Sequence, residues 1–316
     1  MKILTGVLCA TVSVLSASAC DLCSLYVVTE AKEARPGWEV GVAEQYSHFR
    51  DWREDGIKIP NEDHEFIDSS ITQFLLGYRF NHQFGLQVNV PVIYRSFRRV
   101  IEHDIVRGRE SGIGDVSIIG RYRVGEKLWE DGMATLDLFG GLKLPTGDAS
   151  RLSEEAHEDD GGGGHHHPSG VHGHDLALGS GSVDGIIGAS GTVQWRRVFL
   201  AAEIQYALRT EGRFDYQFAN DLTWNGGPGV YLWLDHRGSA ALQFVVSGEW
   251  KGNDKMAGVR TDDTGITAVY LGPAVSATWG ERLSAECAVD LPVHQHTSGL
   301  QIVPDYRVRG GVTIRL

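Results

Sequence analysis

The feature that most constrains this chain is an alternation of apolar and polar residues that recurs along most of its length. From Phe84 to Tyr94 every second residue is apolar or aromatic, and the residues between them include Gln87 and Asn89. A period of two residues is the repeat of a β-strand, whose side chains point alternately to the two faces of a sheet. The alternation therefore predicts an all-β protein.

About twelve stretches carry this alternation. They are 38–49, 70–80, 84–98, 113–124, 133–144, 183–195, 198–209, 222–235, 238–250, 265–279, 283–290 and 304–316. The 40 glycines among 316 residues also favour strands and turns, because a glycine inside a helix costs about 1 kcal/mol relative to alanine.

The spacers between these stretches alternate in length. Those that follow the even-numbered stretches are short, whereas those that follow the odd-numbered ones are long: 50–69, 99–112, 145–182, 210–221, 251–264 and 291–303. Short periplasmic turns and long extracellular loops are typical of outer-membrane barrels. We therefore predict a closed antiparallel up-and-down transmembrane β-barrel of about twelve strands. A secreted β-sandwich or β-solenoid would explain the alternation but not the loop lengths.

The physical reason for closure is backbone hydrogen bonding. In a bilayer every N–H and C=O must be paired within the protein, and a closed barrel pairs all of them. Its outer face then contacts outer-membrane lipid and its lumen can carry charged groups. A formal net charge of −12 argues against a nucleic-acid binder, which should carry a basic stripe.

The first 19 residues are predicted to be a Sec signal peptide, because Lys2 precedes a short apolar stretch and Ala17–Ala19 fits an A-x-A cleavage site. Export by this signal, together with the predicted barrel, places the protein in the outer membrane of a Gram-negative cell. Residues 20–37 would then be a periplasmic segment and 38–316 the barrel. A lipoprotein is the alternative, because Cys20 directly follows the cleavage site.

Cys20 and Cys23 form a C-x-x-C motif at the new N-terminus. In an oxidising compartment we expect a disulfide, with a soft-metal thiolate pair as the alternative. Haem attachment is excluded because Ser24 stands where the ligand histidine is required.

Charged residues on the polar face of the strands are expected to line the pore. They are Arg79, Arg95, Arg121, Arg123, Glu203, Glu249, Glu286, Arg307 and Arg309. If arginines and carboxylates face one another across the lumen, they create a transverse field that selects small polar or charged solutes. Alternatively they pair and stiffen the barrel, because an unpaired buried charge costs several kcal/mol.

The 145–182 spacer contains a His-rich extracellular loop. Its candidate metal ligands are His157, His165, His166, His167, His172 and His174, interspersed with glycines and acidic residues. Imidazole is a good ligand for Zn, Cu and Ni, so this loop could hold one of these ions, although no cofactor is required. The alternative is a solvated polar loop. A metal-binding surface protein, anchored by a closed barrel, is the second functional hypothesis.

Three glycine-rich motifs resemble the outer-membrane transporter family named for the MetA pathway of phenol degradation. They are Gly112–Asp115 with the stretch that follows it, Gly141–Asp148, and Leu178–Asp184. The resemblance implies a barrel that passes small, often aromatic, compounds, and it implies no catalytic residue. The His-rich insertion between the second and third motifs departs from the family pattern.

An enzyme is not predicted. The sequence contains no G-x-S-x-G, H-E-x-x-H or phosphate-binding glycine loop, and no spacing of its loop Asp and His residues favours activation of water. The leading hypothesis is an outer-membrane channel or transporter for small molecules or metal ions.

Overall fold

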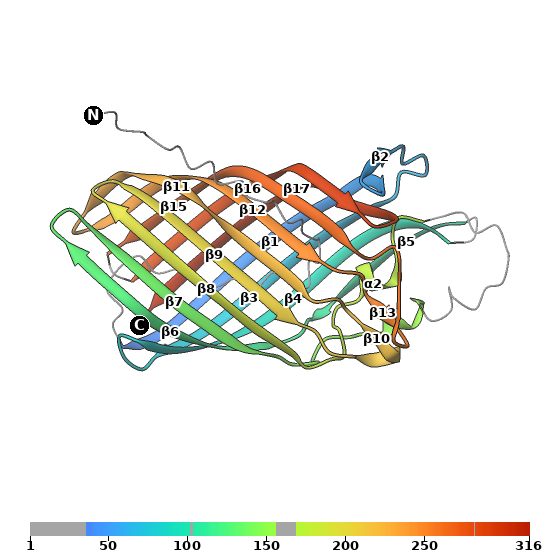
Figure 1. Cartoon of the computed structure of the whole chain (residues 1–316), viewed down its shortest axis with the longest axis horizontal. Coiled ribbons are helices and arrows are strands. Elements are labelled where there is room, and N and C mark those ends of the chain that lie inside the picture. The colour runs from blue at the N-terminus through green and yellow to red at the C-terminus, as the bar shows by residue number, and fades with distance from the viewer. Residues whose placement is uncertain (1–35, 102–103, 156–168, 281) are drawn as a thin grey trace, which may run out of the picture.

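Antiparallel strands that close on themselves make up most of the described chain. The computed structural model describes residues 36–101, 104–155, 169–280 and 282–316. Twelve strands form the barrel wall, and its first and last strands pair from Glu39 with Arg315 to Glu54 with Leu300 (Figure 1). The predicted closed barrel is therefore confirmed, with each strand hydrogen-bonded to its neighbours in sequence order.

The wall strands match the predicted stretches closely. They are β1 (Gly37–Glu54), β3 (Phe66–Arg79), β4 (Phe84–Ile101), β6 (Ser117–Trp129), β7 (Gly132–Lys143), β8 (Asp184–Trp195), β9 (Val198–Leu208), β11 (Asp221–Asp235), β12 (Gly238–Lys251), β15 (Ile266–Trp279), β16 (Leu283–Thr297) and β17 (Leu300–Arg315).

Connections at one end of the barrel are short and those at the other end are mostly long, as predicted. The expected long loop at 291–303 is wrong, because β16 and β17 continue through it and only Ser298 and Gly299 separate them. The pairing of β15 with β16 shifts by one residue here, because Val269 lies opposite His294 and Tyr270 lies opposite Pro292. This irregularity interrupts the apolar–polar alternation of β16, so the alternation ends before the strand does.

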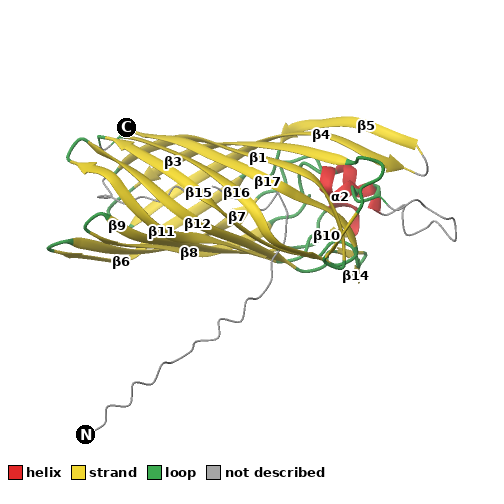
Figure 2. Ribbon diagram, turned by 90° about the horizontal axis from the view of Figure 1, so that it is seen from above, coloured by secondary structure: helices red, strands yellow, loops and turns green. Residues whose placement is uncertain are grey.

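Smaller elements lie at the long-loop end. They are β2 (Ile57–Ile59), β5 (Asp104–Ile113), β10 (Tyr216–Gln217), β13 (Lys255–Met256), β14 (Val259–Arg260), the 3₁₀ turns η2 (Ser150–Ser153) and η3 (Arg213–Asp215), and α2 (Gly173–Leu176). β5 pairs with residues Val92 to Ile101 of β4, and the two strands project beyond the rest of the wall (Figure 2). No helix in the described ranges is long and apolar enough to cross a membrane.

The outer wall is largely apolar and the inner face is buried. On β4, Phe84, Leu86, Val92 and Tyr94 are exposed outward, whereas Ile93 between them is only 1% exposed. Several aromatic side chains are exposed on the outward face, as is typical of interfacial girdles: Trp38, Tyr94, Tyr122, Trp195, Trp250 and Trp279. This distribution suits a wall surrounded by lipid.

One part of the outer wall departs from this rule. On β1 the outward positions Trp38 and Val42 are followed by Glu44, whose carboxylate accepts hydrogen bonds from the hydroxyls of Ser70 and Thr72 on β3. Glu44 lies six residues beyond Trp38, which is roughly 15 Å along the axis of a tilted strand, inside an apolar band of about 25 Å. The expectation that the outer face is apolar throughout is therefore wrong at Glu44.

The next outward positions on the same strands extend this polar stripe. Asp68 Oδ1 lies 2.7 Å from both the Tyr46 hydroxyl and His48 Nδ1. The side chains thus satisfy one another, which lowers the cost of facing lipid.

Candidate functional site

The chain between β7 and β8 folds into the long-loop end of the barrel rather than away from it. We call its described residues, 144–155 and 169–183, the plug. The plug contains η2 and α2, which lie within the mouth of the barrel in Figure 2. The predicted loop at 145–182 therefore occupies the lumen over the parts that the structure describes.

Apolar side chains seat one side of the plug. Val171 and Leu176 pack against a cluster of inward-facing residues from the wall: Phe49, Trp52, Ile67, Phe97 and Ile302. Leu178 packs against Ile71 and Ile93 in a second cluster, which lies deeper in the lumen. Leu176 is fully buried, so this contact stabilises the docked plug by burial of apolar surface.

Polar contacts fix the same side. The buried carboxylate of Glu65 accepts hydrogen bonds from the Ser169 hydroxyl at 2.8 Å and the Gly170 amide at 2.9 Å. Arg95, predicted to line the pore, donates instead to the backbone oxygens of Asp175 and Ala177 in the plug. An arginine of the wall thus holds the plug.

The opposite side of the plug contacts two other loops. Leu152 and Ala177 are fully buried and cluster with Tyr216, Phe218 and Met256 from the β9–β11 and β12–β15 connections. The plug therefore spans the mouth from one wall to the facing loops.

The three sequence motifs meet at the base of the plug in one buried cluster. We call it the motif network: Asp115, Lys143, Ser180, Ser182, Asp184, Arg209 and Asp221. Asp115 Oδ2 accepts hydrogen bonds from Lys143 Nζ at 2.7 Å and from the Ser180 amide and hydroxyl at 2.9 and 2.7 Å. Its other oxygen accepts from the Gly147 amide at 3.0 Å. One carboxylate thereby joins all three motifs.

Asp184 is the second hub of the motif network. It is fully buried and lies 2.8 Å from Lys143 Nζ and 2.9 Å from Arg209 Nη1. Arg209 in turn donates to Asp221 at 2.7 Å. Two cations and three carboxylates with buried side chains thus pair with one another, and within the described residues only Asp221 Oδ1 of these carboxylates has no hydrogen-bond partner. Such pairing is the condition for keeping buried charges out of water.

Motif glycines allow the backbone to cross closely at this point. A side-chain carbon on Gly147 would lie 2.6 Å from the Leu178 carbonyl oxygen, and one on Gly179 would lie 2.6 Å from Gly147 itself. The Leu178 and Gly179 amides both donate to the Asp148 carbonyl. These glycines are therefore required where the plug enters and leaves the lumen.

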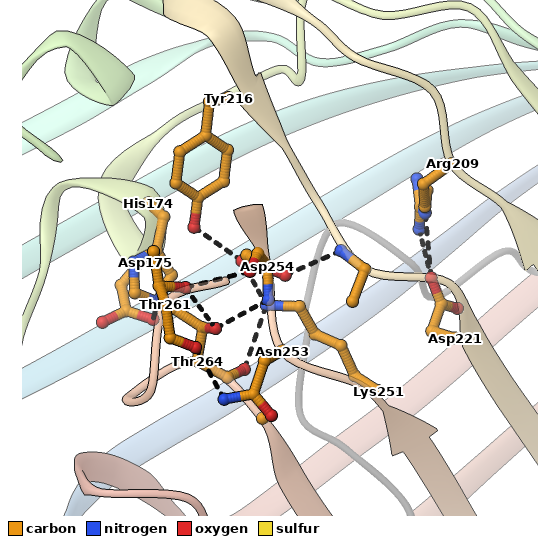
Figure 3. Close-up of polar contacts among 12 residues, drawn as sticks. His174, Asp175, Arg209, Tyr216, Asp221, Lys251, Asn253, Asp254, Thr261 and Thr264 are labelled. Carbon is orange, nitrogen blue, oxygen red and sulfur yellow. Dashed lines mark hydrogen bonds and ion pairs between the residues drawn. The ribbon is translucent and has the colours of Figure 1, made fainter. Parts of the chain in front are cut away.

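A second polar cluster supports the plug from the facing loops. Asp254 is fully buried and accepts hydrogen bonds from the Tyr216 hydroxyl at 2.6 Å, Lys251 Nζ at 2.7 Å and the Ala219 amide at 2.7 Å (Figure 3). The Thr264 hydroxyl accepts from the Asp254 amide. The ring of His174 stacks on Tyr216 at 6.2 Å between centroids and so connects the plug to this cluster.

His172 and His174, two of the predicted metal ligands, lie in the plug with their rings stacked 5.4 Å apart. His174 Nδ1 lies 3.0 Å from Glu155 and its Nε2 lies 3.4 Å from Asp175. Both ring nitrogens of His174 therefore face carboxylates of the plug, and an ion pair rather than a metal is the role that its contacts indicate.

Burial alone would lower the pKa of His174, but the carboxylates of Asp175 and Glu155 outweigh it and raise the pKa to about 10. Burial likewise raises the pKa of Glu155, but His174 and His172 outweigh it and lower the pKa to about 2. His174 and Glu155 are therefore both charged near neutral pH.

This pair predicts how docking of the plug depends on pH. The stabilisation by His174 is complete below its unfolded pKa of 6.5 and is lost as the pH rises toward 10. That by Glu155 is complete above 4.5 and is lost as the pH falls toward 2. Hydrogen-exchange protection of residues 169–183 should therefore be greatest between pH 4.5 and 6.5. The loss of protection at alkaline pH should disappear in His174→Gln and persist in His236→Gln, and an unchanged profile in His174→Gln would contradict the assignment.

The other predicted pore-lining residues lie on the inward face of the wall. Three ion pairs join them to carboxylates: Arg123–Asp137 at 2.9 Å, Arg307–Glu249 at 2.6 Å and Arg309–Asp290 at 2.7 Å. Arg79 is also buried on this face.

Four charged groups from well-separated strands converge toward the short-turn end. Glu203 of β9 interacts electrostatically with Arg121 of β6, Glu286 of β16 and Arg309 of β17. Glu286 is exposed on the inward face, in contrast to the buried residues of the motif network. The inner half of the lumen thus carries charged side chains, and the outer half is occupied by the plug.

Sequence reasoning missed several residues that hold the plug, chiefly Lys143, Arg209 and Asp254. A usable signal was present for two of them, because Lys143 lies in the second motif and Arg209 is the last residue of the alternating stretch 198–209. Their partners are distant in sequence, so spacing alone could not pair them.

Other predicted sites lie outside the described residues. They are the signal peptide 1–19, Cys20 and Cys23, and His157, His165, His166 and His167. Within the ranges that the structure does describe, no group of three or more His, Cys, Asp or Glu residues is arranged to hold a metal ion.

Comparison with solved structures agrees with the fold. An outer-membrane channel from Pseudomonas putida F1 superposes with a TM-score of 0.61 at 15% sequence identity, covering 92% of this chain and 100% of that one. The β domain of the Bordetella autotransporter BrkA gives a TM-score of 0.48 at 11% identity, over 89% of this chain and 100% of that one. At these identities the likeness shows the outer-membrane barrel fold alone. No protein-family model and no curated protein matches the chain.

Proposed function

We propose that the protein is a channel for small solutes in the outer membrane of a Gram-negative cell, exported by the Sec signal 1–19. The observation that carries this proposal is the division of the lumen into a charged inner half and an outer half filled by a docked plug. A barrel serving only as an anchor needs no charged side chains in its lumen. We further propose membership of the MetA-pathway transporter family, because its three motifs form the network that seats the plug.

The charged inner half favours solutes that are small and polar or ionised. Arg121, Glu203, Glu286 and Arg309 place charges of both signs around the same part of the lumen. A low-dielectric wall focuses their field on whatever passes between them. An aromatic acid, which combines a carboxylate with an apolar ring, fits this lining and the family resemblance.

Planar-bilayer recording with the purified full chain tests the channel proposal. We expect discrete current steps, together with a change in the cation-to-anion permeability ratio in Glu203→Gln, because this substitution removes a carboxyl group that interacts with Arg121 and Arg309. Asp131→Asn at the short-turn end is the matched control, since Asp131 is exposed outside the lumen. Absence of current steps, both in this chain and in the plug-deleted variant described below, would exclude the channel.

The second candidate is a metal-binding surface protein anchored by a closed barrel. The observation that favours it concerns Glu155 and Ser169, the described residues on either side of the His-rich tract, which both form hydrogen bonds at the barrel mouth. A metal ion bound by the tract is also compatible with the first candidate function, in which that ion would be the transported solute.

Substitution of His157, His165, His166 and His167 by alanine tests metal binding. We expect the variant to lose most of its Zn²⁺ binding in equilibrium dialysis, because imidazole is the principal ligand type in the tract. His64→Ala with His236→Ala is a control, since these histidines lie far from the tract in sequence. Equal zinc binding by the four-site variant and by the unmodified protein would contradict the hypothesis.

A further inference from the structure

The outward face of the projecting β4–β5 hairpin carries a cluster of arginines that the channel proposal does not use. Arg98 on β4 lies directly opposite Arg107 on β5, and Arg109 lies opposite Ser96 one step nearer the barrel. These three residues alternate with inward-facing ones such as Phe97 and Arg99, so their side chains point away from the lumen.

Like charges directly opposite on adjacent strands destabilise a sheet unless something neutralises them. In the described ranges no carboxylate forms an ion pair with Arg98, Arg107 or Arg109, and the buried Nε of Arg98 has no hydrogen-bond partner. The inward arginines of the same strand differ, because Arg95 donates to plug carbonyls and Arg99 pairs with Glu154 at 2.7 Å. The outward cluster therefore has unused capacity for an anion.

The height of the cluster indicates which anion it meets. The apolar outward face of β4 runs from Phe84 to Tyr94, and this span on a tilted strand is about 25 Å, the thickness of the apolar band. Arg98 and its neighbours are the first charged outward residues beyond Tyr94 on this hairpin. They are therefore level with lipid headgroups, directly above exposed apolar side chains such as Val92 and Ile113.

We propose that Arg98, Arg107 and Arg109 form a binding site for the phosphate groups of a phosphorylated glycolipid in the outer leaflet. Guanidinium groups bind phosphate through paired, charge-assisted hydrogen bonds, and several arginines can share one doubly charged headgroup. The wall below the cluster offers apolar surface to the acyl chains. A lipid is favoured over free phosphate because the arginines can bind its phosphate groups and the apolar wall below them can contact its acyl chains.

Binding of diphosphoryl lipid A to the full chain in detergent micelles tests this site, with native mass spectrometry as the readout. The double variant Arg98→Gln/Arg107→Gln should bind at least about tenfold more weakly, because it removes two charged hydrogen-bond donors. The control Arg237→Gln/Arg282→Gln makes the same charge change in exposed turns at the other end of the barrel and should bind as the unmodified protein does.

Two further measurements decide the source of the phosphate. Dephosphorylated lipid A should bind equally weakly to both proteins, and millimolar inorganic phosphate should compete only slightly. Equal affinity of the double variant and the unmodified protein for diphosphoryl lipid A would overturn the site. Full competition by inorganic phosphate would overturn the lipid assignment. Unchanged β-sheet circular dichroism of the variants shows that they have folded, and none of these readouts depends on channel activity.

Discussion

Replacing residues 149–178 by a short glycine–serine linker is expected to raise single-channel conductance roughly tenfold, because side chains alone do not fill a twelve-stranded barrel once its plug is removed. The linker is feasible because Asp148 already accepts hydrogen bonds from the Leu178 and Gly179 amides, so the two ends of the deletion meet. Planar-bilayer recording of the purified variant measures the effect.

A smaller deletion provides the control for this experiment. Removal of 156–168 alone leaves η2, α2 and their contacts with the wall in the chain, so the conductance should remain that of the unmodified protein. If the larger deletion also leaves the conductance unchanged, the plug does not limit passage through the barrel.

The second large effect is expected from Arg209→Leu. Arg209 is buried and pairs with both Asp184 and Asp221, so its removal leaves two buried carboxylates short of a cation. The expected loss of stability is about 3–5 kcal/mol, the usual cost of breaking a buried ion pair from one side. Urea unfolding in detergent, or the temperature at which the plug loses hydrogen-exchange protection, measures it.

Arg196→Leu is the matched control, because Arg196 pairs with Asp131 in an exposed turn where the two side chains are 64% and 45% accessible. Exposed pairs contribute about 0–1 kcal/mol, so this variant should unfold almost as the unmodified protein does. Equal losses in the two variants would show that the motif network does not hold the plug.

Alternation and loop length were sufficient to predict the wall, because both follow from local geometry. A strand that faces lipid on one side must alternate, as Phe84–Tyr94 does, and hairpins at one end of a barrel are short. The 291–303 segment could not be predicted in this way. Pro292 and Pro304 resemble loop residues, and a register shift hides the strand period, whereas the pairing itself is set by partners on β1 and β15.

The plug lay beyond sequence reasoning for a different reason. A polar, glycine-rich segment has the same composition whether it extends away from the barrel or folds into the lumen. Its contacts with residues distant in sequence determine which of the two conformations it adopts. Arg95 illustrates this, since alternation placed it on the inward face but could not reveal acceptors about 80 residues away. Glu44 illustrates the converse, because hydroxyls on a neighbouring strand permit a carboxylate where the pattern requires an apolar residue.

The order of assembly follows from where the plug is seated. Lys143, Asp184 and Arg209 lie at the ends of three different strands, and Asp115 precedes a fourth. The pocket that receives the plug therefore does not exist until those strands have paired. Pairing of these strands must therefore precede docking, so the mouth of an assembling barrel stays unfilled until the plug docks.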